Sequence, residues 1–266
     1  MTDPFLAGLL IKMVTSAVIV VAASLVVERA GPFMGAMVAT LPISAGPAFA
    51  YLAYEHGPAF LESAALVSLA ANVATAFFIG AYAHVAQRHG PAPSLAAAFA
   101  AWGAAALLVT RVEWTLPAAL ALNGVAFAAA ILATRRLMRV PPGRAPGPPP
   151  WWALPLRAAG VMALVALVVI SGRLIGPAAA GVAALFPVVL TSLSAVLHPR
   201  LGGPATAAVM ANGLTGMLGF TLGLAVLQAT AVPLGSTAAL LAALTLCVVW
   251  NVGLTAGRRL RMRAAV

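Results

Sequence analysis

The side chains in this sequence that could bind a solute are amides and hydroxyls that interrupt long apolar segments, and they occur in two matching sets. Asn72 and Thr75 lie in one apolar segment, and Asn212 and Thr215 lie in another with the same spacing. Residues three apart share a helix face, so each pair offers an amide and a hydroxyl on one side of its helix, where both can hydrogen-bond a small polar solute. The predicted solute-binding residues are Thr40, Pro42, Ser44, Asn72, Thr75, Pro187, Thr191, Asn212 and Thr215.

Two prolines predict breaks in the helices beside these pairs. Pro42 and Pro187 each lie ten residues after the proline that begins their segment, which places them about 15 Å into a membrane at a rise of about 1.5 Å per residue. Each removes the N–H that would bond the carbonyl four residues earlier, Val38 or Ala183. At that depth an unbonded carbonyl needs protein, water or a ligand as its partner. The sequence therefore predicts a solute site near the membrane midplane, where the two breaks and the two Asn/Thr faces converge.

Each of these residues also has a purely structural interpretation. Proline kinks are common in membrane helices, and buried Asn often holds helices together. Lys12 and Arg157 are matched cations near opposite membrane faces. They are either gate charges that attract an anion or side chains that snorkel to the interface. No Asp or Glu falls at the centre of an apolar segment, which argues against a proton-driven cation exporter and favours a neutral or anionic solute.

The sequence contains no pattern typical of catalysis or metal binding. The four histidines lie near segment ends without the spacing of metal ligands, and Cys247 is the only cysteine. We therefore predict no enzyme activity, no metal and no cofactor, although residues distant in sequence could still assemble a membrane enzyme. The net charge of +10 is explained by loop arginines that set membrane topology, so nucleic acid is not a predicted partner.

The elements that carry these residues are predicted to be transmembrane helices. The chain is 63% hydrophobic and only 8% charged, whereas about a quarter of the residues in a soluble domain are charged. Continuous apolar runs of about 20 residues recur, which excludes a β-barrel and predicts an all-α polytopic membrane protein with about nine transmembrane helices. The predicted ranges are 5–28, 32–54, 59–87, 93–110, 115–138, 152–172, 177–197, 203–229 and 234–257.

The arginines predict how these helices cross the membrane. If the Pro-rich linker 139–150 and the basic C-terminal tail both lie in the cytoplasm, twelve of the fourteen arginines lie inside and only Arg111 and Arg173 lie outside. This is the direction of the positive-inside rule. It places the N-terminus outside and the C-terminus in the cytoplasm. The expected location is the bacterial inner (plasma) membrane, which the chain crosses many times.

Helices 1–4 and 6–9 look like two copies of one four-helix unit. At an offset of 145 residues, Pro32 matches Pro177 and Pro42 matches Pro187, and a five-residue deletion then aligns the two Asn-x-x-Thr motifs. One extra helix between the copies forces opposite orientations, the inverted-repeat plan of many secondary transporters. The predicted divisions are residues 1–110, the first repeat; 111–150, the fifth helix and the Pro-rich linker; and 151–266, the second, inverted repeat with the basic tail.

These motifs resemble those of the GlpM-like family of short bacterial inner-membrane proteins. Each half has a basic residue on its first helix, a Gly-Pro at the start of its second helix, a Leu-Pro or Phe-Pro in the middle of that helix, and a third helix rich in small residues. The resemblance implies a fused pair of four-helix units from a family with no firmly assigned activity. The plan of flipped halves is more loosely similar to the drug/metabolite transporter superfamily, whose members usually have five plus five helices.

Together these features predict a transporter that moves a small solute across the inner membrane by alternating access between the two halves. The alternative is a non-transporting intramembrane assembly or accessory protein, in which the Asn/Thr faces only join helices. A membrane enzyme is the third hypothesis. The predicted partners are membrane lipid and a small-molecule solute, and a homo-oligomer is compatible with the sequence.

Overall fold

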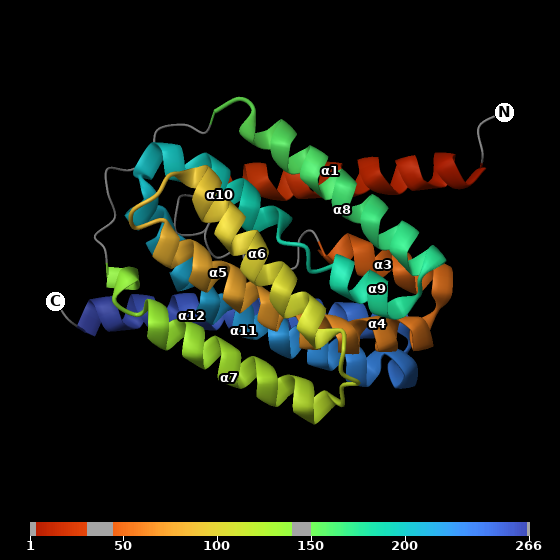
Figure 1. Cartoon of the computed structure of the whole chain (residues 1–266). Helices are drawn as coiled ribbons and strands as arrows, with labels where there is room; N and C mark the ends of the chain where they lie inside the picture. The colour runs from red at the N-terminus through yellow and green to blue at the C-terminus, as the bar shows by residue number, and fades with distance from the viewer. Residues whose placement is uncertain (1–3, 31–44, 140–149, 265–266) are drawn as a thin grey trace.

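The computed structural model describes residues 4–30, 45–139 and 150–264, and every regular element within these ranges is a helix. The helices pack side by side in one elongated bundle (Figure 1). They are α1 (Pro4–Ala30), α3 (Ala45–His56), α4 (Pro58–Ala71), α5 (Val73–Val85), α6 (Pro91–Val109), α7 (Leu116–Thr134), the 3-10 turn η1 (Leu137–Arg139), α8 (Ala153–Leu174), α9 (Pro177–Ala183), α10 (Val188–Leu201), α11 (Gly203–Leu234) and α12 (Ser236–Ala264).

Eight helical segments in the described ranges are long and apolar enough to cross a membrane, as expected for an all-helical, multi-pass membrane protein. Two of these eight are interrupted, because α4 and α5 form one span and α9 and α10 form another. The predicted helix 32–54 is described only from Ala45 onwards, as α3. Val38 and the predicted site residues Thr40, Pro42 and Ser44 lie outside the described residues.

Glycine–proline pairs set the starts of two spans. Gly57 has a φ of 82° and Gly176 a φ of 112°, values in the left-handed region that glycine adopts without steric cost. Pro58 and Pro177 follow them as the first helical residues, a position where the missing proline N–H would have no partner in any case. The chain therefore turns sharply at each glycine and begins a new helix at the proline that follows.

The span formed by α4 and α5, called the central rod below, is the element around which the others pack. Of the residues in its most apolar stretch 72% are buried, against 17% for α7 and 17% for α12. The rod runs parallel to α9 and α10, since Ser68 contacts Gly181 and Tyr82 contacts His198. It is therefore enclosed by protein, whereas α7 and α12 turn most of their surface outwards.

Two further contacts fix the direction of α11. The Gln228 amide lies 3.5 Å from the Glu62 carboxylate, and Asn72 donates to Thr221 at 3.0 Å. Residue numbers therefore fall on α11 as they rise on the central rod, which makes these two elements antiparallel.

The helices α1 and α8 also lie side by side (Figure 1). The Arg173 guanidinium, near the end of α8, lies 4.1 Å from the centre of the Phe5 ring, near the start of α1. These two helices are therefore antiparallel as well.

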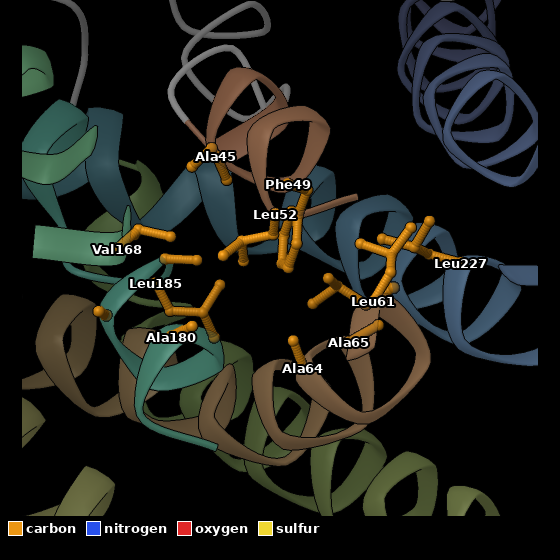
Figure 2. Close-up of a cluster of buried hydrophobic side chains, with 14 of the residues drawn as sticks. Ala45, Phe49, Leu52, Leu61, Ala64, Ala65, Val168, Ala180, Leu185 and Leu227 are labelled. Carbon is orange, nitrogen blue, oxygen red and sulfur yellow. The ribbon is translucent and has the colours of Figure 1, made fainter. Parts of the chain in front are cut away.

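The main hydrophobic core lies where α3, α4, α8, α9 and α11 meet. Figure 2 shows side chains from all five elements gathered there, including Phe49, Leu61, Val168, Ala180 and Leu227. Leu52 and Leu61 are fully buried in it. Burial of this kind holds the rod to its neighbours by dispersion and close packing, because lipid offers apolar helices little hydrophobic gain from association.

One glycine permits the closest approach inside this core. A Cβ added to Gly181 of α9 would lie 2.5 Å from the carbonyl oxygen of Ala64 on α4. No larger residue fits without moving one helix away from the other. The small side chain therefore lets the two backbones touch, as small residues do at many membrane helix interfaces.

Candidate functional site

The central rod is interrupted at Asn72, halfway along its length. The Leu69 carbonyl, which a regular helix would bond to the N–H of Val73, instead accepts the Asn123 Nδ2 at 2.6 Å and the Asn72 N–H at 3.3 Å. The Thr75 N–H then bonds the Asn72 carbonyl at 3.0 Å in a tighter turn. A side chain from α7 has thus entered the hydrogen-bond ladder of the rod, which is a common cause of helix breaks.

Four polar side chains gather at this interruption, and we call Ser68, Asn72, Asn123 and Thr221 the polar cluster. They come from α4, from the junction before α5, from α7 and from α11. Asn72 Nδ2 donates to Asn123 Oδ1 at 3.1 Å and to Thr221 Oγ1 at 3.0 Å. Ser68, Asn72 and Asn123 are fully buried, and Thr221 is 5% exposed. The cluster therefore joins three spans through side-chain hydrogen bonds inside the protein.

The orientation of each amide in the polar cluster follows from its partners. Asn123 Nδ2 donates to two carbonyls, those of Leu69 at 2.6 Å and Ala119 at 2.9 Å. Its Oδ1 must then face Asn72 and accept from Asn72 Nδ2, because an amide has donors on one side and an acceptor on the other. This leaves Asn72 Oδ1, a fully buried acceptor, with no hydrogen-bond donor in the part of the chain that the structure describes.

Pro187 breaks the second interrupted span, as predicted. The helix α9 ends at Ala183 and α10 begins at Val188. The Ala183 carbonyl has lost its helical donor, as predicted, and protein supplies the replacement, because it accepts the Phe186 N–H at 3.0 Å. In this tighter turn the Leu185 N–H bonds the Val182 carbonyl instead of the Gly181 carbonyl. The Gly181 carbonyl is therefore available, and it accepts the Ser68 hydroxyl at 2.8 Å.

Thr191 and Thr75 are placed close to the two interruptions. The Thr191 hydroxyl is half-buried and donates to the Pro187 carbonyl of its own helix at 2.7 Å. Thr75 is 5% exposed and lies on α5, three residues past Asn72. Both predicted residues therefore flank the region where the two broken spans meet, although Thr191 is occupied by its own backbone.

The second Asn/Thr pair does not join the polar cluster. Asn212 Nδ2 donates to the Ala208 carbonyl at 2.8 Å and lies 3.4 Å from the Met138 carbonyl on η1. The Thr215 hydroxyl donates to the Asn212 carbonyl at 3.0 Å. Asn212 lies nine residues before Thr221 on α11, a separation of about 13 Å along the helix axis. The two Asn/Thr faces therefore lie at different heights along the bundle rather than converging.

The two predicted gate cations lie on different helices. Lys12 on α1 forms an ion pair with Glu55 on α3, and its Nζ lies 5.7 Å from the centre of the Tyr51 ring. Arg157 is half-buried near the start of α8. Because Glu55 already balances its charge, Lys12 is a poor candidate for attracting a free anion in this arrangement.

Three residues of the polar cluster were not predicted from the sequence. Ser68 lies one helical turn before Asn72, so it shares the Asn72 side of the helix. Asn123 is an amide in the middle of the apolar helix 116–134. Polar residues at such positions usually pack against other helices or serve a function, so Asn123 could have been included among the predicted site residues. Nothing in the spacing of Thr221 points to its partner, which is 149 residues away.

Aromatic side chains contact one another at the α9–α10 break. Phe186, in the break itself, stacks on Phe99 with ring centres 5.6 Å apart and meets Trp102 edge to face at 5.5 Å. Trp102 also packs against a small cluster of buried alanines, Ala74, Ala105 and Ala106. Its Nε1 is a second buried polar atom without a partner among the described residues.

Comparison with protein-family models, with curated proteins and with solved structures finds no match to this chain.

Proposed function

We propose that the protein is a small-solute transporter of the bacterial inner membrane, with its solute site at the polar cluster, and that it favours a neutral or anionic solute over a cation. The observation that carries the proposal is Asn72 Oδ1, which is fully buried and accepts no hydrogen bond from any described residue. Leaving a buried acceptor unpaired costs about 1–3 kcal/mol. A solute that donates a hydrogen bond there would recover that energy.

The depth of Asn72 supports a role in transport. Asn72 lies 14 residues after Pro58 and 13 before Val85, which is about 20 Å from either end of the central rod. The rod and the α9–α10 span are both interrupted, and the Ser68–Gly181 hydrogen bond joins them there. Transporters commonly place their solute site where discontinuous helices meet near the middle of the membrane.

Helix directions also support the proposal of inverted halves with a cytoplasmic C-terminus. The first helix of each proposed repeat is α1 or α8, and these two are antiparallel neighbours. With alternating spans, Arg88, Arg135, Arg136 and Arg200 belong to one end of the bundle. The positive-inside rule makes that end the cytoplasmic one. A fused pair of GlpM-like units remains the expected origin of this arrangement.

The second candidate function is a membrane assembly or accessory protein, in which the polar cluster only joins helices. The hydrogen bonds from Asn72 to Asn123 and Thr221 favour this reading, since each ties the rod to another span. The accessory role does not explain why Asn72 Oδ1 is unpaired, because a purely structural amide would be more stable with all its groups bonded. We therefore place transport first.

The variant Asn72→Ala separates the two functions. It removes two hydrogen bonds worth about 0.6 kcal/mol each in a membrane. It also removes the unpaired Asn72 Oδ1 but leaves the buried Asn123 Oδ1 without its donor, and these two costs of about 1–3 kcal/mol cancel. The net destabilisation is about 1 kcal/mol, so we expect most of the folded yield to remain, together with at least a tenfold loss of solute flux in proteoliposomes. The control is Asn251→Ala on α12, a buried Asn that donates to the Cys247 carbonyl of its own helix. Loss of folded protein in Asn72→Ala with normal flux from the remainder would support the accessory role.

A further inference from the structure

We infer that Asn123 is a positioning residue that makes the polar cluster select small neutral solutes that donate hydrogen bonds, such as alcohols, amides and ureas, over anions. The inference rests on the proposed transport function and names the solute class for the same site. Each polar atom of Asn123 already has a protein partner. Its Nδ2 donates to the Leu69 and Ala119 carbonyls, and its Oδ1 accepts from Asn72.

Asn123 acts by fixing which face of the Asn72 amide remains free. With Asn123 Oδ1 held towards it, Asn72 must present Nδ2 on that side. Thr221 reinforces this choice, because its hydroxyl proton points to the Met217 carbonyl at 3.2 Å and its lone pair accepts from Asn72 at 3.0 Å. A flipped Asn72 would set two carbonyl oxygens against each other. With respect to the described residues, the atom of this amide left without a partner is therefore an acceptor, Asn72 Oδ1.

A free acceptor at this place discriminates between classes of solute. An alcohol, amide or urea donates to Asn72 Oδ1 and satisfies it. A carboxylate or phosphate oxygen would face another oxygen, and no member of the polar cluster carries a positive charge to compensate. A cation would find no carboxylate in the cluster, so its own burial would be uncompensated. Discrimination of this kind arises because the wrong solute leaves buried polar groups unpaired.

Tracer uptake into proteoliposomes tests this inference, with glycerol and urea as donor probes, formate as the anion and methylammonium as the cation. For the unmodified protein we expect glycerol or urea to enter at least tenfold faster than formate and methylammonium, after subtraction of empty liposomes. Uptake of formate as fast as the donor probes would overturn the inference and leave transport standing. No uptake of any probe above empty liposomes would overturn the proposed function, and the solute class with it.

The positioning role is tested by the ratio of glycerol to formate uptake in variants. In Asn123→Ala the Asn72 amide is free to turn, so we expect the ratio to fall at least fivefold. Thr221→Val removes the second acceptor of Asn72 Nδ2 while keeping the shape of the side chain, and we expect a smaller fall. It also serves if Asn123→Ala does not fold. The ratio should be unchanged in Asn251→Ala. If the position-123 and position-221 variants lose flux of both probes equally, with the ratio intact, Asn123 has only a structural role.

Discussion

Replacing Gly181 by alanine should separate the two broken spans, and the structure sets the size of the effect. The added Cβ would lie 2.5 Å from the Ala64 carbonyl oxygen, 3.2 Å from Ser68 Oγ and 3.3 Å from the Ala64 carbonyl carbon. An ordinary contact begins at 3.4 Å, so α4 and α9 must move apart by roughly 0.9 Å, the difference between 3.4 and 2.5 Å. Because two of these atoms belong to backbone, no side-chain rotation relieves the clash.

The expected cost follows from three contributions. Overpacking a well-filled interior costs about 1–3 kcal/mol. The Ser68–Gly181 hydrogen bond, 2.8 Å long, would stretch or break, at about 0.6 kcal/mol. Alanine in place of glycine within a helix returns about 1 kcal/mol. The net destabilisation is about 0.6–2.6 kcal/mol, which lowers the unfolding midpoint by roughly 2–8 °C in a chain of this size.

The matched control is Gly124→Ala on α7, since a Cβ at Gly124 would meet nothing within 4 Å. Only the helix-propensity gain of up to about 1 kcal/mol then applies. Unfolding is followed in detergent with a thiol-reactive fluorophore, because Cys247 is the only cysteine and is 1% exposed in the folded chain. The reasoning fails if Gly181→Ala unfolds at the same temperature as Gly124→Ala or higher.

Two further predictions concern contacts elsewhere in the bundle. Lys12→Met should lower the free energy of unfolding by about 2 kcal/mol, because it leaves Glu55 without its cation in a partly buried place. The double variant that also carries Glu55→Gln should recover most of this loss in the same thermal assay. A double variant as unstable as Lys12→Met would contradict the prediction. Gly219→Val should also unfold earlier, since a Cβ at Gly219 would lie 2.5 Å from Trp250 Cδ1. The displaced indole should change its fluorescence emission, and an unchanged spectrum with an unchanged midpoint would refute the contact.

Much of the helical framework could be predicted from the sequence because it depends on local properties. Continuous apolar runs, Gly-Pro pairs and charge clusters mark most span ends, and the break before Pro187 follows from a missing N–H. The loss of the helical donor at Ala183 could be predicted, but the group that replaces this donor could not. The chain tightened into a short turn that bonds Ala183 and frees Gly181.

The interruption of the central rod could not be predicted in this way. Asparagine is a modest helix former rather than a breaker, and Asn72 continues the helical path until the Asn123 side chain takes the Leu69 carbonyl. That competition depends on tertiary packing between segments 54 residues apart. The prediction that the Asn212 motif meets the Asn72 motif failed for the same reason. Local spacing is the same in the two copies, but the partners that approach each copy are not.

The sequence separation of the partners has a consequence for synthesis. The ribosome adds 51 residues from Asn72 to its partner Asn123, 113 from Ser68 to Gly181, and 149 from Asn72 to Thr221. At about 5–20 residues per second the last of these partners emerges roughly 7–30 s after the rod. During that time the most enclosed span of the finished protein is a newly inserted helix whose polar face borders lipid or the insertion machinery. The helix α7 is the first to supply a hydrogen-bonding partner for the polar face of the rod, so helix assembly should begin at the Asn72–Asn123 contact and then add the later spans.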